Sequence, residues 1–421
     1  MMSLERIDEW LEQVNNIGKT SAPGLYRLAY TREEQDALDV FRGLCEKEGM
    51  TVRDDAAGNL IARREGTADF PAVALGSHLD TVYAGGQYDG TLGVLAGLEV
   101  IHRLNQKNLR TTHPVEVIVF RAEESSRFGT ATIGSKLMSG KADLSKLAAL
   151  KDKDGIPFPE AVERAGFSFE KLADARRPQS DIKTFMELHI EQGPVLESKQ
   201  LPVGIVTGIA APLRLRVHVK GQASHSGTTS MDMRRDALTG ASALILDLEA
   251  GARKEKDNHT VATVGSIEAS PGAMNVIPGQ CRFDVDIRST DTASRERVYR
   301  QFLQTAGLLE QTRGLSVQIE TLAEEQPVPL SSQVQNGLKE ICSNLNLTPV
   351  WMPSGAGHDV MNMAEQWPSG LLFVPSVNGL SHHPDEFTSL AHTVEAVDVL
   401  EHAVHIEADA GRSKNHMEVR S

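Results

Sequence analysis

The sequence has few cysteines and no long apolar segment. Its three cysteines, Cys45, Cys281 and Cys342, lie far apart and match neither a thiolate metal site nor a disulfide framework. No apolar run approaches the ~20 residues that a membrane helix needs, and the N-terminal residues contain no apolar signal segment. We therefore expect a protein of a reducing compartment, cytoplasmic and without a membrane partner.

The sequence also lacks an excess of positive charge. Lysine and arginine number 43 against 57 acidic residues, which gives a formal net charge of -14. Since phosphate backbones are bound through Lys and Arg, this balance argues against a nucleic-acid partner. The 421 residues, 40% of them hydrophobic, are enough for two or three globular domains.

The first two hundred residues alternate short apolar strands with helical segments. Strands are predicted at 72–75, at 115–120 and around 186–190, and residues 91–106 have apolar side chains at helical spacing. Strands that alternate with helices predict an α/β fold with much parallel sheet.

The middle of the chain has a different pattern. Residues 213–219 alternate apolar and polar side chains, as in a strand with one solvated face. A helix at 235–252, strands at 261–269 and 281–287, a helix at 294–308 and a strand at 315–319 follow. The order βαββαβ predicts a ferredoxin-like α+β domain at 212–325. It would be inserted into a catalytic domain formed by 1–211 and 326–421, and the charged tail after Arg412 is expected to have no fixed structure.

The densest chemical signal is GSHLDTVYAGGQYDG, residues 76–90. A strand ends there and places His78 at its carboxyl end, where open α/β sheets bind ligands. The Asp80 carboxylate could fix the tautomer of His78, and Asp89 follows in a glycine-rich turn that allows close backbone approach to a metal. By itself, this motif is compatible with a metal site or with a satisfied polar loop.

A second strand ends at Glu123 and Glu124. Two adjacent carboxylates near a core are costly unless a cation compensates their charge. One of them can bind a metal while its neighbour acts as general base. A surface acidic pair is the alternative. Glu123 and Glu124 lie at the carboxyl end of a strand, as His78 does, and this position favours a functional role.

Histidines follow two further strands. His189 alternates with Leu188 and Ile190, and the pair His382–His383 follows a strand and a glycine turn near the C-terminus. A lone strand histidine is more often structural, but both positions repeat the strand-end pattern. Mixed imidazole and carboxylate ligands suit Zn²⁺, Mn²⁺, Co²⁺ or Ni²⁺, and a bridging aspartate is typical of sites with two metals ~3.5–4 Å apart.

These segments resemble the di-metal aminoacylase and carboxypeptidase family, and within it the hydantoinase/carbamoylase branch. That branch contains N-carbamoyl-L-amino-acid hydrolases, allantoate and ureidoglycolate amidohydrolases and β-ureidopropionases. The matching motifs run in order from about residue 58 to 390: GSHLDTV, GGQYDG, EESSRF, HIEQGPVLE, HSGTTSMDMRRDAL, NVIPG, FDVDIRS, SGAGHD and GLSHHPDEF. The resemblance implies an aminopeptidase-like α/β catalytic domain of mixed sheet, with the inserted domain as lid and homodimer contact.

The resemblance also implies two divalent metal ions and their ligands. His78 and His189 would hold one ion, Glu124 and His382 the other, and Asp89 would bridge both. The family motif places the ligand directly after Ser, which favours His382 over His383. Many related peptidases have a carboxylate where this sequence has His189, whereas the carbamoylase branch has histidine.

The remaining site residues are assigned by the same resemblance. Glu123 would take a proton from the attacking water and return it to the leaving nitrogen, while His225 and Asn275 would stabilise the oxyanion. Arg288 would bind the substrate carboxylate, because a guanidinium matches a carboxylate bidentately; a salt bridge on the sheet surface is the alternative. The pocket would be lined by Gln192, Gly355, Ala356, Gly357 and His358.

The predicted reaction is hydrolysis of an N-carbamoyl-L-amino acid to the amino acid, carbon dioxide and ammonia. Allantoate or ureidoglycolate amidohydrolase is the alternative, because these substrates also carry a ureido group beside a carboxylate. A dipeptidase or aminoacylase is disfavoured by His189 and its HIEQGP context. A non-catalytic binding protein is least favoured, because Glu123 and all five predicted ligands are present.

Overall fold

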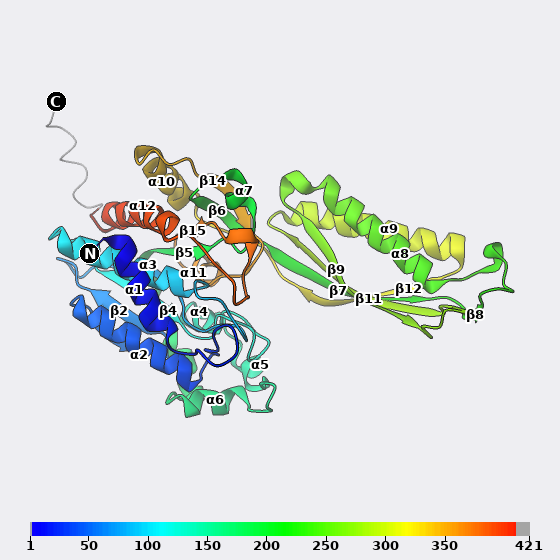
Figure 1. Ribbon diagram of the computed structural model, residues 1–421, viewed down its shortest axis with the longest axis horizontal. Coiled ribbons are helices and arrows are strands. Elements are labelled where there is room, and N and C mark those ends of the chain that lie inside the picture. The colour runs from blue at the N-terminus through cyan, green and yellow to red at the C-terminus, as the bar shows by residue number, and fades with distance from the viewer. Residues whose placement is uncertain (1, 410–421) are drawn as a thin grey trace. The chain divides into compact units, whose positions relative to one another are not determined.

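The structure is a computed structural model that describes residues 2–409. The chain divides into two compact units (Figure 1). The large unit contains the described residues up to Thr207 and from Leu330, and the small unit is Gly208–Pro329. The predicted inserted domain, 212–325, lies inside the small unit, and its role as lid or dimer contact stays a prediction. The tail after Arg412 lies outside the described residues.

A nine-stranded mixed sheet forms the centre of the fold, in the order β1-β2-β4-β3-β5-β15-β6-β13, with β14 paired to β6. Its central pairs, β3 with β4, β3 with β5 and β5 with β15, are parallel. The strands are β1 Thr51–Asp54, β2 Leu60–Arg64, β3 Ala72–His78, β4 Val115–Phe120, β5 Ile182–Ile190, β6 Gly204–Ile209, β13 Val328–Pro329, β14 Val350–Ser354 and β15 Ser369–Val374. The predicted α/β class with a mixed sheet is confirmed.

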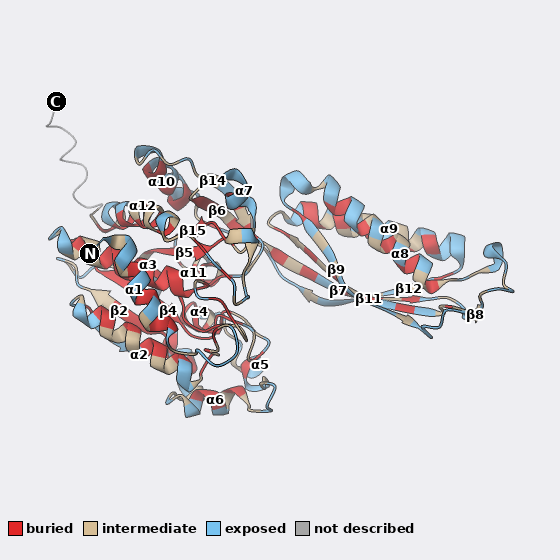
Figure 2. Cartoon of the chain, in the orientation of Figure 1, coloured by how far each residue is buried: buried red, intermediate tan, exposed pale blue. Residues whose placement is uncertain are grey.

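The central strands are apolar because both of their faces are covered. Every residue of β3 and β4 is buried. In Figure 2 the buried residues, in red, are concentrated in the centre of the large unit. The strand predicted at 72–75 continues to His78, so this histidine is the last strand residue. His189 alternates with Leu188 and Ile190 as predicted, but its face of β5 is also buried.

Helices cover the sheet of the large unit. They are α1 Ser3–Asn15, α2 Arg32–Lys47, α3 Thr91–Gln106, α4 Ile133–Met138, α5 Leu144–Ala148, α6 Phe158–Arg164, α7 Val195–Lys199, α10 Ser332–Asn344, α11 Val360–Met363 and α12 Leu390–Asp409, with short 3₁₀ turns at Phe169–Ala175, Gln179–Asp181 and Val377–Gly379. Helix α3 packs against β3 and β5 and contacts α1 and α12. Within the described residues, no helix is long and apolar enough to span a membrane.

The small unit has a ferredoxin-like arrangement. Its antiparallel sheet has the order β12-β7-β11-β9, and α8 and α9 cover one face of it (Figure 1). The elements are β7 Ala211–Lys220, β8 Ser224–His225, α8 Ala237–Lys254, β9 Val261–Ser270, β10 Val276–Ile277, β11 Gln280–Ser289, α9 Thr292–Arg313 and β12 Ser316–Glu324, with 3₁₀ turns at Met231–Met233 and Lys256–Asn258. The alternating patterns of β7 and β11 bury their apolar side chains beneath the helices.

Candidate metal centre and active site

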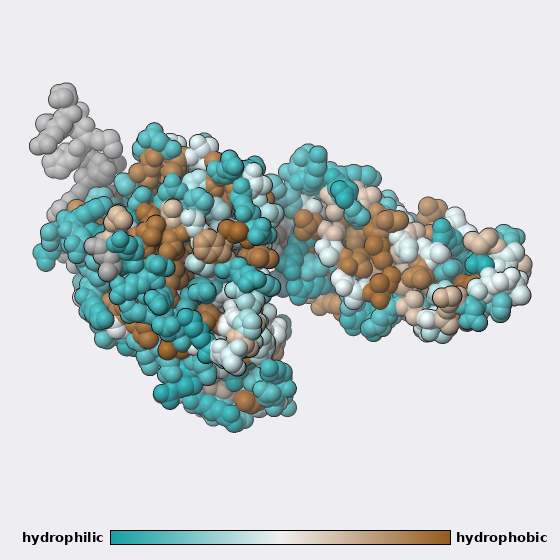
Figure 3. Space-filling view, viewed as in Figure 1, coloured by the Kyte–Doolittle hydropathy of each residue, from teal (hydrophilic) through white to brown (hydrophobic). Residues whose placement is uncertain are grey.

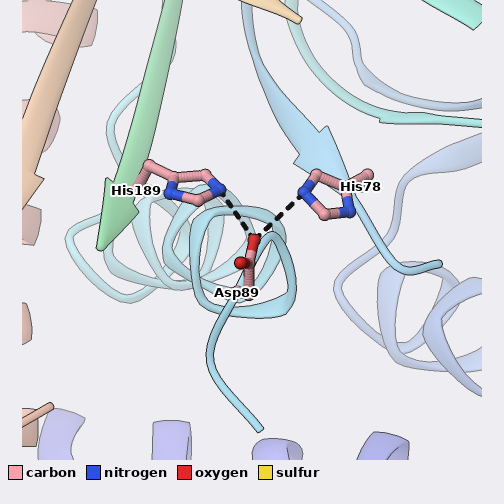
Figure 4. A group of neighbouring side chains, drawn as sticks. All are labelled: His78, Asp89 and His189. Atoms are coloured by element: carbon pink, nitrogen blue, oxygen red, sulfur yellow. Dashed lines mark ion pairs between the residues drawn. The ribbon is translucent and has the colours of Figure 1, made fainter. Parts of the chain in front are cut away.

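Two histidines and an aspartate meet at the carboxyl end of the central strands. His78 ends β3, His189 is near the end of β5, and Asp89 lies just before α3. The Oδ1 atom of Asp89 is 3.4 Å from Nε2 of His78 and 3.1 Å from Nε2 of His189 (Figure 4). Since β3 and β5 are adjacent and parallel, their ends bring both imidazoles to the same edge of the sheet.

A second group of ligand atoms faces the other oxygen of Asp89. The Nε2 atom of His382 is 3.3 Å from Oδ2 of Asp89 and 3.2 Å from Oε1 of Glu124. His383 points its Nδ1 at the N–H of Asp385, 3.1 Å away. The two oxygens of Asp89 therefore face different groups, which is the arrangement that a bridging carboxylate requires.

The donor set fits metal ions. In each group the three ligand atoms lie within 4.8 Å of one another. Ligands at the usual Zn–N and Zn–O lengths of a tetrahedral site are about 3.3 Å apart, and the separations of 3.1 to 3.4 Å around Asp89 match this spacing. The five residues that the sequence proposed as ligands are brought together.

The tautomers of both buried histidines are set by main-chain carbonyls. Nδ1 of His78 faces the carbonyl of Asp80 at 3.0 Å, and Nδ1 of His189 faces that of Ile190 at 2.9 Å. A carbonyl only accepts, so Nδ1 carries the proton and the lone pair of Nε2 faces Asp89. The sequence had suggested the Asp80 carboxylate for this role.

The Asp80 carboxylate instead holds the turn after β4. Its oxygens accept hydrogen bonds from the main-chain N–H groups of Glu123, at 3.2 Å, and Glu124, at 3.0 Å. Its Oδ1 atom is 3.6 Å from Nδ1 of His78. Because only a short turn separates Asp80 from His78, one loop orients the adjacent glutamates and a predicted ligand together.

Glu123 lies beside the predicted ligands. Its Oε2 atom is 3.7 Å from Nε2 of His78. Burial raises the pKa of Glu123 well above its ordinary value, and the Glu124 carboxylate adds to this rise while His78 opposes it. Burial alone would also raise the pKa of Asp89, but the surrounding imidazoles hold it well below its ordinary value.

Gln192 contacts the centre directly. Its Nε2 donates to Oδ2 of Asp89 at 2.9 Å and to Oγ of Ser381 at 3.0 Å. Its Oε1 is buried and has no hydrogen-bond partner among the described residues. Gln192 has a φ of 58°, and Ala122 and His382 are also left-handed, so three strained residues border the site.

Glu386 is a residue of the site to which the sequence gave no role. It is 3% exposed, and its Oε1 accepts hydrogen bonds from the N–H groups of Tyr88 and Asp89 at 2.9 Å each. Burial raises the pKa of Glu386 to about 7, to which the charge of Asp89 contributes. The available signal was an acidic residue in the HHPDEF motif, shortly after His382.

His358 is buried against His189. Its Nε2 is 2.9 Å from Oγ of Ser354, and its ring meets that of His189 edge-on, with centroids 4.4 Å apart. Burial, and then His189, hold the pKa of His358 well below its ordinary value. Glu187, His189 and His358 form a further group of possible ligands.

The nearby loop 355–357 was predicted to line the pocket. The N–H of Ala356 donates to Ser354 Oγ at 3.1 Å, so this amide is already used within the loop. The Glu187 carboxylate of the adjacent group is likewise engaged, by Ser77 Oγ at 2.8 Å and the N–H of Val360 at 2.9 Å. Gly355, Ala356 and Gly357 therefore keep only a predicted role in lining the pocket.

The other predicted substrate contacts lie on the small unit, and the structure does not bring them all together. His225 pairs with Val276 across β8 and β10, next to Asn275. Arg288 lies near the far end of β11, which has 10 residues, and a strand of this length spans roughly 30 Å. There the Arg288 guanidinium makes two hydrogen bonds to Asp286, at 3.0 and 3.1 Å.

Comparison with known proteins shows the family to which the chain belongs. Peptidase family M20/M25/M40 matches residues 72–406. The chain belongs to this family. An uncharacterized hydrolase of Haemophilus influenzae is 42% identical over 97% of this chain and 99% of its own length. The N-carbamoyl-L-amino acid amidohydrolase of Geobacillus stearothermophilus is 40% identical over 96% of this chain and 98% of its own.

More distant relatives agree with this assignment. The allantoate amidohydrolase of Escherichia coli is 34% identical over 94% of this chain and 96% of its own. The solved structure of an amidase of the hydantoinase/carbamoylase family from Burkholderia multivorans is 33% identical, with a TM-score of 0.90 over 96% of this chain and 98% of that one. The predicted family and its hydantoinase/carbamoylase branch are confirmed.

Proposed function

We propose that this protein hydrolyses N-carbamoyl-L-amino acids to the amino acid, carbon dioxide and ammonia. The observation that carries the proposal is Asp89, whose two oxygens face two groups of ligand atoms, one containing His189. The predicted enzyme class, a hydrolase of carbon–nitrogen bonds other than peptide bonds, is confirmed by the relatives. Similarity to an N-carbamoyl-L-amino acid amidohydrolase over almost the whole chain supports the substrate.

Two divalent metal ions are part of the proposal, with Zn²⁺, Mn²⁺, Co²⁺ and Ni²⁺ as candidates. His78 and His189 would hold one ion and Glu124 and His382 the other, while Asp89 would hold both. When bound, such ions polarise a carbonyl and make water more acidic.

Glu123 is proposed as the general base and acid. It takes a proton from the attacking water, whose oxygen bonds to the ureido carbon, and gives this proton to the amino-acid nitrogen as the carbon–nitrogen bond breaks. The carbamic acid that remains decomposes to carbon dioxide and ammonia. The Asp80 carboxylate supports this role because it anchors the main-chain N–H of Glu123.

Gln192 is proposed to recognise the ureido group. The carbonyl of a ureido group bears a terminal NH₂ group, whereas the carbonyl of an acyl group bears a carbon substituent with no N–H donor at that position. The buried Oε1 of Gln192 needs a donor, since it has no partner among the described residues. The loop that contains Gly355, Ala356, Gly357 and His358 would line the pocket beside it.

His225, Asn275 and Arg288 are proposed to contact the substrate from two different subunits. His225 and Asn275 lie near the first residue of β11 and Arg288 near its last, roughly 30 Å away for a strand of this length. One small unit therefore cannot present all three residues to one small ureido acid. A homodimer could supply the oxyanion donors from one subunit and the carboxylate clamp from the other.

The small unit has features suited to such a homodimer. Strand β9 is at the edge of the four-stranded sheet, and Val261 and Ile267 on it are 55% and 47% exposed. Helix α8, which packs against β9, exposes 66% of Leu246, and Figure 3 shows apolar side chains gathered over this helix. An edge strand beside exposed apolar residues favours pairing with a second copy.

A cytoplasmic location is proposed from the thiol groups. Cys45, Cys281 and Cys342 are all free and buried, which is typical of proteins in a reducing compartment.

Allantoate or ureidoglycolate hydrolysis is the second candidate, because an allantoate amidohydrolase is also similar along nearly the whole chain. The test compares ammonia release from N-carbamoyl-L-methionine and from allantoate by the metal-loaded enzyme. We expect the first substrate to give the higher kcat/KM. Turnover of allantoate alone would overturn the proposed substrate, and no turnover of any ureido acid would overturn the proposed reaction.

A further inference from the structure

The loop between β7 and α8 carries His225 and folds back on itself. The N–H of Thr229 donates to the carbonyl of His225 at 3.2 Å and closes a turn over residues 225–229. The N–H of Ser226 donates to the carbonyl of Asn275 at 3.0 Å, beside the pairing of His225 with Val276. The loop thus presents His225 and Asn275 next to each other, both exposed.

A hydrogen bond inside this turn sets the tautomer of His225. The main-chain N–H of Gly227 donates to Nδ1 of His225 at 3.1 Å. An atom that accepts such a bond carries no proton, so the proton of the neutral ring is on Nε2. His78 and His189 have the opposite arrangement, because their Nδ1 atoms face main-chain carbonyls. The predicted ligands therefore offer an Nε2 lone pair, whereas His225 offers an Nε2–H donor.

Arg234 holds the turn that contains Gly227. Its Nε donates to the carbonyl of Thr229 at 3.1 Å and its Nη2 to the carbonyl of Ser226 at 2.6 Å. These two carbonyls lie on either side of Gly227 in the chain. A planar guanidinium presents its N–H groups in a fixed fork, so one side chain can fasten both carbonyls. Arg234 is half-buried, while the tip of the turn that it fastens is exposed.

The close packing of Gly227 also indicates that this turn sets the tautomer of His225. A Cβ atom at position 227 would lie 3.3 Å from Cε1 of His225 and 3.6 Å from its Nδ1. The turn therefore lies directly against the imidazole edge that its N–H contacts. A shift of the turn would break the bond to Nδ1 and leave the two tautomers of His225 free to exchange.

We propose that Arg234 is a positioning residue that keeps His225 as an Nε2–H donor for the oxyanion on the ureido carbonyl. The role in the reaction rests on the proposed function, whereas the control of the tautomer does not. Oxyanion donors act by being oriented before charge develops. Arg234 supplies this orientation from within the small unit, without itself touching the substrate.

The direct test is ¹⁵N NMR of the histidine side chains in the zinc-loaded enzyme, with His225 assigned by its loss in His225→Gln. Wild type is expected to show an unprotonated Nδ1 and a protonated Nε2 at His225. Arg234→Ala and the charge-conserving Arg234→Lys are expected to move both ¹⁵N shifts toward a tautomer average. The control is Arg253→Ala, which removes an exposed arginine of α8 paired with Glu249, and the His225 shifts should not change.

Kinetics separate positioning from general loss of structure. Arg234→Ala should lower kcat by about 10- to 100-fold, with little change in KM, metal content or melting temperature. If Arg234 acts through His225, the double variant His225→Ala/Arg234→Ala should be no slower than His225→Ala alone. Arg234→Lys tests the same point should Arg234→Ala fail to fold.

Two outcomes would overturn the inference: a His225 tautomer unchanged in both Arg234 variants, or losses that multiply in the double variant. A wild-type enzyme that turns over no ureido acid, yet gives the expected spectra, would overturn the proposed function while the link from Arg234 to the His225 tautomer stands.

Discussion

The side chain of Glu386 accepts a hydrogen bond from the main-chain N–H of Asp89 at 2.9 Å. The same oxygen accepts from Tyr88, and Ser381 Oγ lies 3.3 Å from the other oxygen. A Cβ atom at Gly86 would lie 2.2 Å from this carboxylate, so only glycine allows the contact. Glu386 therefore ties the turn of the predicted bridging ligand to the loop that carries His382.

Glu386→Gln should weaken metal binding. Above its raised pKa of about 7, Glu386 is ionised. The amide keeps the shape of the side chain but removes the charge that draws the N–H groups of Tyr88 and Asp89, so the bridging carboxylate loses its orientation at such pH. We expect metal affinity to fall about 10- to 100-fold, measured by competition with a chelator. The control Glu249→Gln removes an exposed carboxylate of α8. Equal affinities in wild type and Glu386→Gln would show that this contact does not orient the ligand.

Gly90→Ala should disrupt the centre. Gly90 has a φ of 65°, and a Cβ atom there would lie 2.4 to 2.5 Å from three atoms of the His78 ring. The clash must displace a predicted ligand, so we expect reduced metal content and activity at least about 100-fold lower. Gly43→Ala is the matched control and should retain full activity, because the added carbon in helix α2 meets no atom within 4 Å apart from its chain neighbours and the adjacent helix backbone. Normal activity of Gly90→Ala would contradict the close approach.

Glu123→Gln should keep the metals and lose turnover. The amide cannot accept the proton of water, and the loss of a general base lowers kcat by about 100- to 10,000-fold. Metal analysis and kcat for N-carbamoyl-L-methionine check the two halves of this prediction. If the variant stays near the wild-type rate, the assignment of Glu123 is wrong.

Arg288→Ala should mainly raise KM. The guanidinium is already aligned by its two hydrogen bonds to Asp286, and a charge-assisted bond is worth about 1.5 to 3 kcal/mol. We therefore expect KM to rise about 10- to 150-fold with a smaller change in kcat. Arg282→Ala removes an exposed arginine of the same strand, paired with Glu268, and should leave KM unchanged. An unaltered KM in Arg288→Ala would point to another carboxylate-binding residue.

The fold and the candidate ligand positions could be predicted from local patterns, whereas the choice of Glu124 and His382 as ligands rested on the family resemblance. Apolar runs identify β3, β4 and β5, and the carboxyl ends of adjacent parallel strands meet at one edge. Polar residues at those ends, such as His78 and His189, therefore had to lie close together. Alternation in β7 and β11 likewise identified the ferredoxin-like sheet.

The contacts that orient these residues could not be predicted, because they join distant segments or depend on single atoms. Glu386 reaches a turn whose residues are almost 300 positions earlier in the chain. The acceptor for Nδ1 of His78 is the nearer of the carbonyl and the carboxylate of Asp80, at 3.0 and 3.6 Å, and no residue pattern encodes which one is nearer. The pairing of Arg288 with Asp286 follows from i and i+2 sharing a strand face, while the binding of a substrate carboxylate by Arg288 stays a prediction.

The most direct test of the central claim compares N-carbamoyl-L-methionine with N-acetyl-L-methionine in wild type and Glu123→Gln, after reconstitution with Zn²⁺ or Mn²⁺. The account predicts equal amounts of methionine and ammonia from the carbamoyl substrate, at least 100-fold slower release from the acetyl substrate and no turnover by the variant. Equal rates on both substrates, or ammonia release that survives in Glu123→Gln, would contradict a ureido hydrolase built around Asp89 and Glu123.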